Sequence, residues 1–346
     1  MSTIEATRTL PHNADFLFIY EAIQCNPNGD PDQENKPRMD YETKTNLVTD
    51  VRLKRYVRDY MKQNGLDVFV DMEGDSKVSA DSKLKAVIDR LMSDEGFVNE
   101  VFADQPEYKK TFDDLVKKKK KDSDSIFKIL QDAKKDTKVV EMNRYILEHL
   151  VKARFLDIRL FGSAFAVAGF TKAYTGPVQI NWGYSLHPVE LMESNSLVTI
   201  MADDSSTFGK DYRVHYSLLA FHGTMNKHQA RRTGMSEEDA ESFRDALWQS
   251  IPSLPTRSKQ NQYPKLYLEV VYNEGHNNGS FGDLRQHLNV LPKEGKSEKQ
   301  IRNINDLDID FSDLKTLLDE HTGEGKAIKE VIVKSAPAFD HPFGNA

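Results

Sequence analysis

The sequence predicts an α+β protein: a βαββαβ sandwich of the ferredoxin-like kind with a helical insertion after its first helix. Two patterns predict this class. Segments rich in alternating, β-branched and aromatic residues occur at the start of the chain and in series after residue 153, separated by amphipathic helices. Residues 73–152 instead form long, charged, helix-prone runs that no strand pattern interrupts. A chain of 346 residues is long enough for two domains.

The first strand and the first helix are separated by a long polar loop. We predict the strand at residues 16–24, FLFIYEAIQ, which ends in the turn-forming cluster NPNGDP. The helix is predicted over residues 47–63, with N-cap chemistry from Thr45-Asn46 and a stop at Asn64-Gly65. Residues 67–70, DVFV, are a candidate for a short strand.

The second half of the chain is predicted to be mainly sheet. Its strand candidates are FLDIRLFGSAFAVAG, GPVQINWGYSLHP, SLVTIMA, DYRVHYSLLAFHGT and KLYLEVVY. A capping box at residues 236–239, SEED, opens an amphipathic helix that Pro252 ends. One more helix, DLKTLLDEH, and one more strand, AIKEVIVKS, complete the pattern.

The composition bounds the compartment but not the partner. No apolar run approaches the ~20 residues needed to cross a bilayer, the N-terminus lacks an apolar signal region, and the single cysteine, Cys25, excludes an internal disulfide. We therefore expect a soluble, cytoplasmic protein without membrane contact. The net charge of -7 is uneven, because residues 109–138 hold eleven lysines against six aspartates, whereas residues 301–346 hold nine acids against five bases. An acidic total therefore does not exclude a nucleic acid.

The helix predicted at residues 47–63 has an apolar face and a cationic face. Lys54 and Arg58 are one turn apart, a spacing that neighbouring phosphates of a nucleic-acid backbone match. The alternative is a solvated surface helix in which Asp50 and Asp59 pair with the arginines. The apolar arc holds Leu53, Tyr56, Val57 and Tyr60, and the opposite arc holds Arg52, Lys54, Arg55 and Arg58.

The polar loop upstream, CNPNGDPDQENKPRMD, leads from the first strand towards this helix. Its amides and Arg38 can hold a backbone or a base, and the alternative is a loop that only connects. Because loop and helix adjoin in the chain, both are expected near one end of the sheet, which favours one shared site. The lysine run 117–121 has two interpretations as well: a solvated loop or helix end, or a non-specific clamp on target DNA.

These residues carry a family resemblance. The stretch NPNGDPDQENKPRMDYETKTNLVTDVRLKRYVRDYM resembles the N-terminal signature of the Cascade backbone subunits of type I CRISPR systems, most like the subtype I-B branch. These subunits belong to the repeat-associated mysterious protein superfamily. Further similar blocks are RLFGSAFA, GPVQINWGYS and YRVHYSLLAFHG followed by TGMSEEDAESFRDALW, so the resemblance is spread over most of residues 15–288. Each block alone is weak, but the combination is specific.

The resemblance implies a modified RNA-recognition fold with a thumb-like β-hairpin. Its palm would comprise residues 14–72 and 153–346, with the thumb at about 191–212, and residues 73–152 would form a helical insertion domain. Such subunits polymerise along CRISPR RNA as a helical oligomer in antiviral defence, bind other Cascade subunits, and present the guide for pairing with target DNA. Backbone subunits of the type I branch are not nucleases, and the ten histidines show no metal-ligand pair at helical spacing, so we expect no enzymatic activity, no cofactor and no metal.

Individual contacts follow from the same resemblance. In this family the helix matching LVTDVRLKRYVR contacts phosphates, and the matching loop and glycine-containing GSAF turn approach the RNA backbone. Lys54 and Arg58 are the favoured positions. Met192 or Met201 is implied as an apolar thumb wedge against a base, with ordinary packing as the alternative. The implied RNA-binding residues are Asn26, Asn28, Arg38, Thr49, Arg52, Lys54, Arg55, Arg58, Gly162 and Ser163.

Two rival functions stay open. Relatives in type III complexes cut target RNA with a loop aspartate, so a metal-dependent ribonuclease is one alternative, although carboxylates beside Asn, Gly and Pro are also common turn formers. A generic RNA-recognition module is the other, and it would stack bases on aromatic residues of its sheet, but no ribonucleoprotein octapeptide is present. The candidates are Asp30, Asp32 and Asp40 for cleavage, and Phe16, Phe18 and Tyr20 for stacking.

Overall fold

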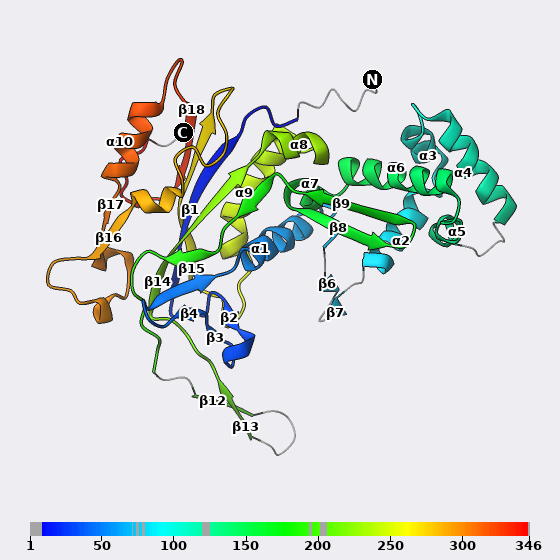
Figure 1. Cartoon of the computed structure of the whole chain (residues 1–346). Coiled ribbons are helices and arrows are strands. Elements are labelled where there is room, and N and C mark those ends of the chain that lie inside the picture. Colours follow the sequence, from blue (N-terminus) through cyan, green and yellow to red (C-terminus); the bar gives the residue numbers. More distant parts are fainter. Residues whose placement is uncertain are drawn as a thin grey trace. The chain divides into compact units, whose positions relative to one another are not determined.

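The computed structural model divides into two compact units, labelled by element in Figure 1. Unit 1 contains Met61–Pro177 and Lys227–Glu241, and unit 2 contains His12–Tyr60, Val178–Asn226 and Ser242–Ala346. No helix in the described part of the chain is both long and apolar enough to span a membrane. The structure describes residues 9–70, 72–73, 76–77, 80–119, 125–193, 196–200 and 206–344.

Unit 2 is built on a sheet in the order β18-β15-β1-β14-β11-β5-β4, with β10 also paired to β14. Strands β1 and β11 both run antiparallel to β14, so they are parallel to each other. Strands β14 and β15 both run antiparallel to β1, so they too are parallel to each other. Helix α1 follows β1, and α9 joins β14 to β15, so strands of two β-α-β units are interleaved. The α+β class is therefore confirmed. The bounds are β1 Ala14–Ile23, β4 Met39–Asp40, β5 Thr45–Val48, α1 Asp50–Gln63, β10 Val178–Ile180, β11 Gly183–Ser185, β14 Tyr216–Met225, α9 Glu237–Ser253, β15 Gln262–Tyr272 and β18 Ile328–Ser335.

Strand β1 lies at the centre of the sheet because both of its faces are apolar. Successive side chains of a strand point to opposite faces, and Phe16 packs against Phe243 of α9 with ring centroids 5.7 Å apart. On the other face, Leu17 and Ile19 join a core with residues of β17 (Leu307–Asp310) and α10 (Ser312–His321), the orange and red-orange elements of Figure 1. Phe16, Phe18 and Tyr20 are fully buried. They are thus not available for stacking, which counts against the generic RNA-recognition module.

Three predicted elements are wrong in whole or in part, two of them because a distant segment competes for the backbone. Residues 45–48 form β5 rather than the start of the helix, since Leu47 and Val48 pair with Tyr184 and Gly183 of β11. Residues 67–70 form no strand. The N–H groups of Phe69 and Val70 donate instead to the Asp157 carboxylate at 2.8 and 3.0 Å. In the predicted strand segment FLDIRLFGSAFAVAG, the first half forms helix α7 (Leu156–Phe161) and the second half forms strand β8 (Gly162–Val167).

The helix-prone runs of residues 73–152 form helices α2 to α6, all within unit 1. This unit also contains α7, the hairpin of β8 and β9, and α8 (Lys227–Thr233), because the hairpin and α8 pack with the helices. Arg159 of α7 forms a two-pronged ion pair with Asp239 at 2.7 and 2.8 Å, and Asp239 exchanges capping-box hydrogen bonds with Ser236. The remaining bounds in unit 1 are β6 Met72–Glu73, β7 Ser76–Lys77, α2 Ala80–Leu91, α3 Glu95–Val101, α4 Pro106–Lys119, α5 Ile126–Asp132, α6 Thr137–Ala153, β8 Gly162–Val167 and β9 Phe170–Thr175.

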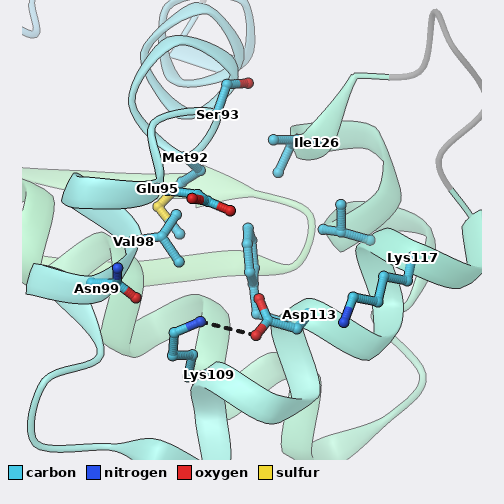
Figure 2. A pocket seen from close by; sticks show the side chains of 11 residues that line it. Met92, Ser93, Glu95, Val98, Asn99, Lys109, Asp113, Lys117 and Ile126 are labelled. Atoms are coloured by element: carbon cyan, nitrogen blue, oxygen red, sulfur yellow. Dashed lines mark hydrogen bonds and ion pairs between the residues drawn. The ribbon is translucent and has the colours of Figure 1, made fainter.

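A pocket of about 480 Å³ opens among the helices of unit 1 (Figure 2). Apolar side chains such as Val98 and Phe112 line it together with the ion pair between Lys109 and Asp113, 2.9 Å long. Lys117 of the lysine run also lines this pocket. The first residues of the run form the last turn of α4, and residues 120 and 121 lie outside the described residues.

Candidate nucleic-acid interface

The loop that follows β1 is held in shape by its own polar groups. Strand β2 (Gly29–Asp30) pairs with β3 (Lys36–Pro37), and the turn between them places Asn35 in the left-handed region at φ 59°. The Asn26 side chain donates to the Asn35 carbonyl at 2.8 Å. A Cβ on Gly29 would lie 1.9 Å from Asn35 Oδ1, so any larger residue there would displace the Asn35 side chain. These contacts give the loop a defined conformation.

Asn28 joins this loop to helix α1. Its Oδ1 accepts hydrogen bonds from the backbone N–H and the hydroxyl of Thr49, at 2.9 and 3.0 Å. The Thr49 hydroxyl in turn accepts from the Arg52 N–H at 3.2 Å, so Thr49 is the N-cap of α1. The loop and the basic helix, which the sequence predicts in one shared site, are thus physically connected. Asn28 and Thr49 use their side-chain oxygens for this connection.

The cationic face of α1 is partly neutralised by its own acids. Lys54 pairs with Asp50 at 3.0 Å, and Arg55 pairs with Asp59 at 2.7 Å. The alternative interpretation of a paired surface helix is thus correct for Arg55, whereas Asp50 pairs with a lysine. Partly exposed pairs at this spacing are worth only about 0.3–0.5 kcal/mol, so a polyanion can replace either acid. Four cations against two acids leave the segment from Asp50 to Asp59 at +2.

A lysine from a distant segment of the chain lies near α1. Lys259, in the loop before β15, donates to the Asn26 carbonyl. Burial, and next the positive charge of Arg52, lower the pKa of Lys259 to about 8. The Arg52 guanidinium stacks 4.0 Å from the Tyr56 ring, and its buried Nε has no hydrogen-bond partner within the described ranges. Lys259 was not predicted, because nothing in its local sequence, TRSKQNQY, indicates that it meets Arg52.

Arg38 lies where the loop returns to the sheet. Its guanidinium is 3.3 Å from Asp30 and 5.9 Å from the ring centroid of Trp182. The Arg38 carbonyl accepts from the Leu47 N–H and the Asn46 side chain, at 2.8 and 2.9 Å, which anchors the loop to β5. This anchoring holds an arginine beside an aromatic ring at the edge of the polar loop.

Comparison with known proteins decides the family. Residues 12–312 match the family model described as CRISPR-associated protein Cas7. This chain belongs to the Cas7 family. The CRISPR-associated protein Cas7 of Haloferax volcanii is 28% identical over 323 residues, which span 90% of this chain and 84% of the relative. A chain of a solved "CRISPR RNA-guided surveillance complex, pre-nicking" shares the fold, with a TM-score of 0.51 and 13% identity over 95% of this chain and 94% of that one.

The hairpin predicted as a thumb is present in this Cas7 chain. Strands β12 (Ser196–Ile200) and β13 (Ser206–Lys210) pair antiparallel. At the foot of the hairpin, Glu34 of the loop accepts from Lys210 at 3.2 Å and from the Tyr212 hydroxyl at 2.8 Å, and these hydrogen bonds, Tyr212 first, lower the pKa of Glu34. Met192 lies half-buried at the same foot, where its N–H donates to the Arg213 carbonyl. Met201 lies outside the described residues.

Gly162 and Ser163 belong to unit 1, where they form a helix-to-strand junction instead of the predicted turn. Gly162 ends α7 at φ 73° and begins β8, and a Cβ there would lie 2.2 Å from the Tyr174 carbonyl oxygen. Ser163 pairs with Tyr174 in the β8–β9 hairpin. Close packing of the two strands thus accounts for the glycine, and the RNA contact of both residues stays a prediction.

The acidic residues of the loop serve local turns. The Asp30 carboxylate accepts from the Asp32 N–H at 3.2 Å and pairs with Arg38. Asp40 accepts from the Glu42 N–H at 3.0 Å. Hydrogen bonds from the Thr43 side chain and then from Glu42 lower the pKa of Asp40. Turn formation, the alternative considered for these aspartates, thus describes Asp30 and Asp40.

Proposed function

We propose that this Cas7 chain is a structural subunit that polymerises along CRISPR RNA and forms the backbone of a Cascade-type surveillance complex. The observation that carries the proposal is the family match over residues 12–312. Its partners would be CRISPR RNA, target DNA through the guide heteroduplex, other copies of itself and other Cascade subunits, in the cytoplasm. The resemblance of the N-terminal signature supports subtype I-B. In this role the chain positions RNA and cuts nothing.

The contacts around α1 support a backbone-reading role. Phosphate contacts need cations that can exchange weak protein partners for phosphate oxygens. Lys54 and Arg55 have such weak partners within α1, and Arg38 has one in Asp30. The proposed direct contacts are Arg38, Arg52, Lys54, Arg55 and Arg58.

A second group of predicted residues would position the first. Asn28 and Thr49 fix the start of α1, and the Asn26 carbonyl receives Lys259. Their side-chain oxygens or carbonyls are already used inside the protein, so we assign them to shaping the loop. Gly162 and Ser163 are proposed as backbone-proximal contacts from unit 1. The hairpin β12–β13 is proposed as the thumb, with Met192 or Met201 as its wedge, on a palm of residues 14–72 and 153–346.

The test is to co-express the protein with a CRISPR array, purify it and measure the bound RNA. We expect RNA of uniform length. Lys54→Ala combined with Arg58→Ala should weaken binding equally for unrelated spacer sequences. It should also reduce the slope of log affinity against log salt by about 0.7 for each phosphate of a single strand that is no longer neutralised.

The matched control is Lys315→Ala, because Lys315 also pairs with an aspartate four residues away, Asp319, on helix α10 of the same unit. It should leave affinity and salt slope unchanged. A loss of affinity that depends on spacer sequence, or an equal loss in the control, would contradict the assignment of α1 to the RNA backbone.

A further inference from the structure

Trp182 is an exposed aromatic ring on a fixed support. It precedes β11, and 49% of its surface is accessible. The next residue, Gly183, packs so closely on the sheet that a Cβ would lie 2.3 Å from the Phe221 ring. The Trp182 carbonyl accepts from Arg285 at 2.7 Å, and Arg285 is held by Asp283 at 2.6 Å. The backbone of Trp182 therefore has little freedom, although its ring faces solvent.

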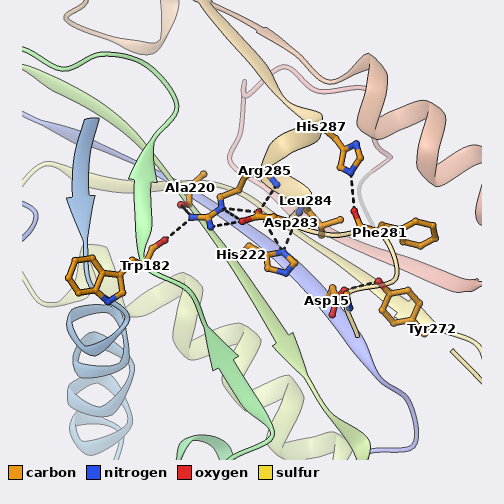
Figure 3. Close-up of polar contacts among 11 residues, drawn as sticks. Asp15, Trp182, Ala220, His222, Tyr272, Phe281, Asp283, Leu284, Arg285 and His287 are labelled. Atoms are coloured by element: carbon orange, nitrogen blue, oxygen red, sulfur yellow. Dashed lines mark hydrogen bonds and ion pairs between the residues drawn. The ribbon is translucent and has the colours of Figure 1, made fainter. Parts of the chain in front are cut away.

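The support for Trp182 comes from a buried polar network (Figure 3). Arg285 is only 6% exposed, donates a second hydrogen bond to the Ala220 carbonyl at 3.3 Å, and stacks 4.0 Å from the Tyr184 ring. Figure 3 shows the Trp182 carbonyl directed at this network and its indole directed away from it. The network thus fixes the backbone and leaves a large ring in water, where a partner outside the chain can reach it.

The ring lies beside the candidate nucleic-acid interface. The strand register pairs Gly183 with Val48, so Trp182 immediately precedes this pair and Thr49, the N-cap of α1, immediately follows it. On the loop side, the Arg38 guanidinium lies 5.9 Å from the indole. The buried Arg38 Nε has no hydrogen-bond partner in the part of the chain that the structure describes. An aromatic face and a guanidinium are thus adjacent.

We infer that Trp182 is a stacking platform for an unpaired RNA base, and that Arg38 contacts the phosphate of the same nucleotide. This inference rests on the proposed function and adds a binding residue to its site. A nucleotide suits the pair, because its base offers a π face to the indole and its phosphate a charge to the guanidinium. An apolar protein surface would instead have to desolvate Arg38 and Asp30.

Tryptophan fluorescence tests the stacking directly. The chain has two tryptophans, so Trp248→Phe leaves Trp182 as the sole reporter. Single-stranded RNA should quench this reporter, whereas an abasic strand of the same length, with the same phosphates, should not. The converse variant, Trp182→Phe, retains only Trp248 and should show no quenching. Equal quenching by both strands, or none by RNA that binds, would overturn the inference.

Affinity measurements separate this inference from the proposed function. Trp182→Ala should weaken single-stranded RNA binding about 5- to 150-fold, the range for the removal of one stacked base, and leave the salt slope unchanged. Trp182→Phe should restore most of the affinity, and Tyr263→Ala, another exposed aromatic of unit 2, should have no effect. If wild-type protein binds RNA and Trp182→Ala binds it equally well, Trp182 is no platform and the proposed function stands. If wild-type protein binds no RNA, the proposed function fails first.

Discussion

The two sides of the sheet of unit 2 differ in how they are covered, since α9 packs on one of them through Phe243 and the layer of β16 (Asn289–Pro292), β17 and α10 packs on the other. The loop after β1 and the helix α1 are joined by Asn28 and Thr49 and carry cations with weak partners. The layer of β16, β17 and α10 is instead acidic, and its exposed carboxylates include Asp308, Asp310, Asp313, Asp319 and Glu320.

This difference explains how a chain of net charge -7 can bind a polyanion. The acidic layer covers the sheet face with apolar side chains such as Phe311 and Leu314 and presents carboxylates outward. RNA is therefore repelled from this layer, whereas the cations of α1, which outnumber its acids, attract it. The local arrangement of charge, and not the net charge of the chain, thus indicates where a polyanion can bind.

The largest expected effect concerns a residue that covers the sheet and is not expected to bind RNA. Phe311 is buried in the acidic layer, with the Phe343 ring 5.5 Å away. Phe311→Ala should lower the free energy of unfolding by roughly 3–5 kcal/mol, because it leaves a cavity above the sheet. Chemical denaturation measures this, and RNA affinity of the folded protein should not change. Leu291→Ala, on the exposed side of the same layer, should alter neither, and weaker RNA binding by folded Phe311→Ala would break the comparison.

The next effect tests the buried cation near α1 by pH. The folded protein holds Lys259 at a pKa of about 8, against about 10.4 in an unfolded chain. Between these values the unfolded state binds the extra proton, so stability should rise with pH across that window, by roughly 1–3 kcal/mol from this group. Denaturation of Lys259→Met against wild type at pH 7.5 to 10 measures the difference. Lys315→Met, in the acidic layer, should show the same dependence of stability on pH as wild type. If Lys259→Met also showed the wild-type dependence, the assignment of the lowered pKa to Lys259 would be refuted.

A smaller effect compares two acids in the same sequence relation to a lysine. Asp50 pairs with Lys54 on α1, and Asp319 pairs with Lys315 on α10. Asp50→Asn should raise RNA affinity about 1.5- to 5-fold at low salt, since it releases Lys54 from a weak pair. Asp319→Asn should leave affinity as it is. Filter binding measures both, and equal gains would mean that RNA does not distinguish the two helices.

The smallest expected effect concerns catalysis. Asp30→Asn and Asp40→Asn remove carboxylates that the structure shows in local turns. We expect complementary RNA to stay intact with wild type and with both variants when Mg²⁺ or Mn²⁺ is supplied. Gel analysis of labelled RNA checks this. Metal-dependent cleavage that either substitution abolishes would replace the structural role by that of a ribonuclease.

The strands with long apolar or alternating patterns were predictable. Strands β1, β14, β15 and β18 occur where composition places them, and the first three are buried over most of their length. The start of α1 was not predictable in this way. Leu47 and Val48 fit a helix as well as a strand, and their pairing with β11, far away in the sequence, decides the outcome.

The site was predictable as a region and less so in its contacts. The adjacency of loop and helix indicated one site, and the Asn28–Thr49 contact supports it. The approach of Lys259 to Arg52 and the anchoring of Trp182 by Arg285 join segments that only the folded sheet brings together. No local pattern carries such information, because each residue taken alone is an ordinary surface lysine, tryptophan or arginine.

The acidic layer also has a consequence for the order of synthesis. Leu17 and Ile19 leave the ribosome early, but the side chains that cover them, from Leu284 to Phe343, are made last. Until then one face of the nascent sheet presents apolar strands to water, a state that favours association with other chains. Shortened chains that end before residue 284 should therefore collect in the insoluble fraction and depend on chaperones. A premature stop codon in the last fifth of the chain would therefore reduce solubility before it affected RNA binding.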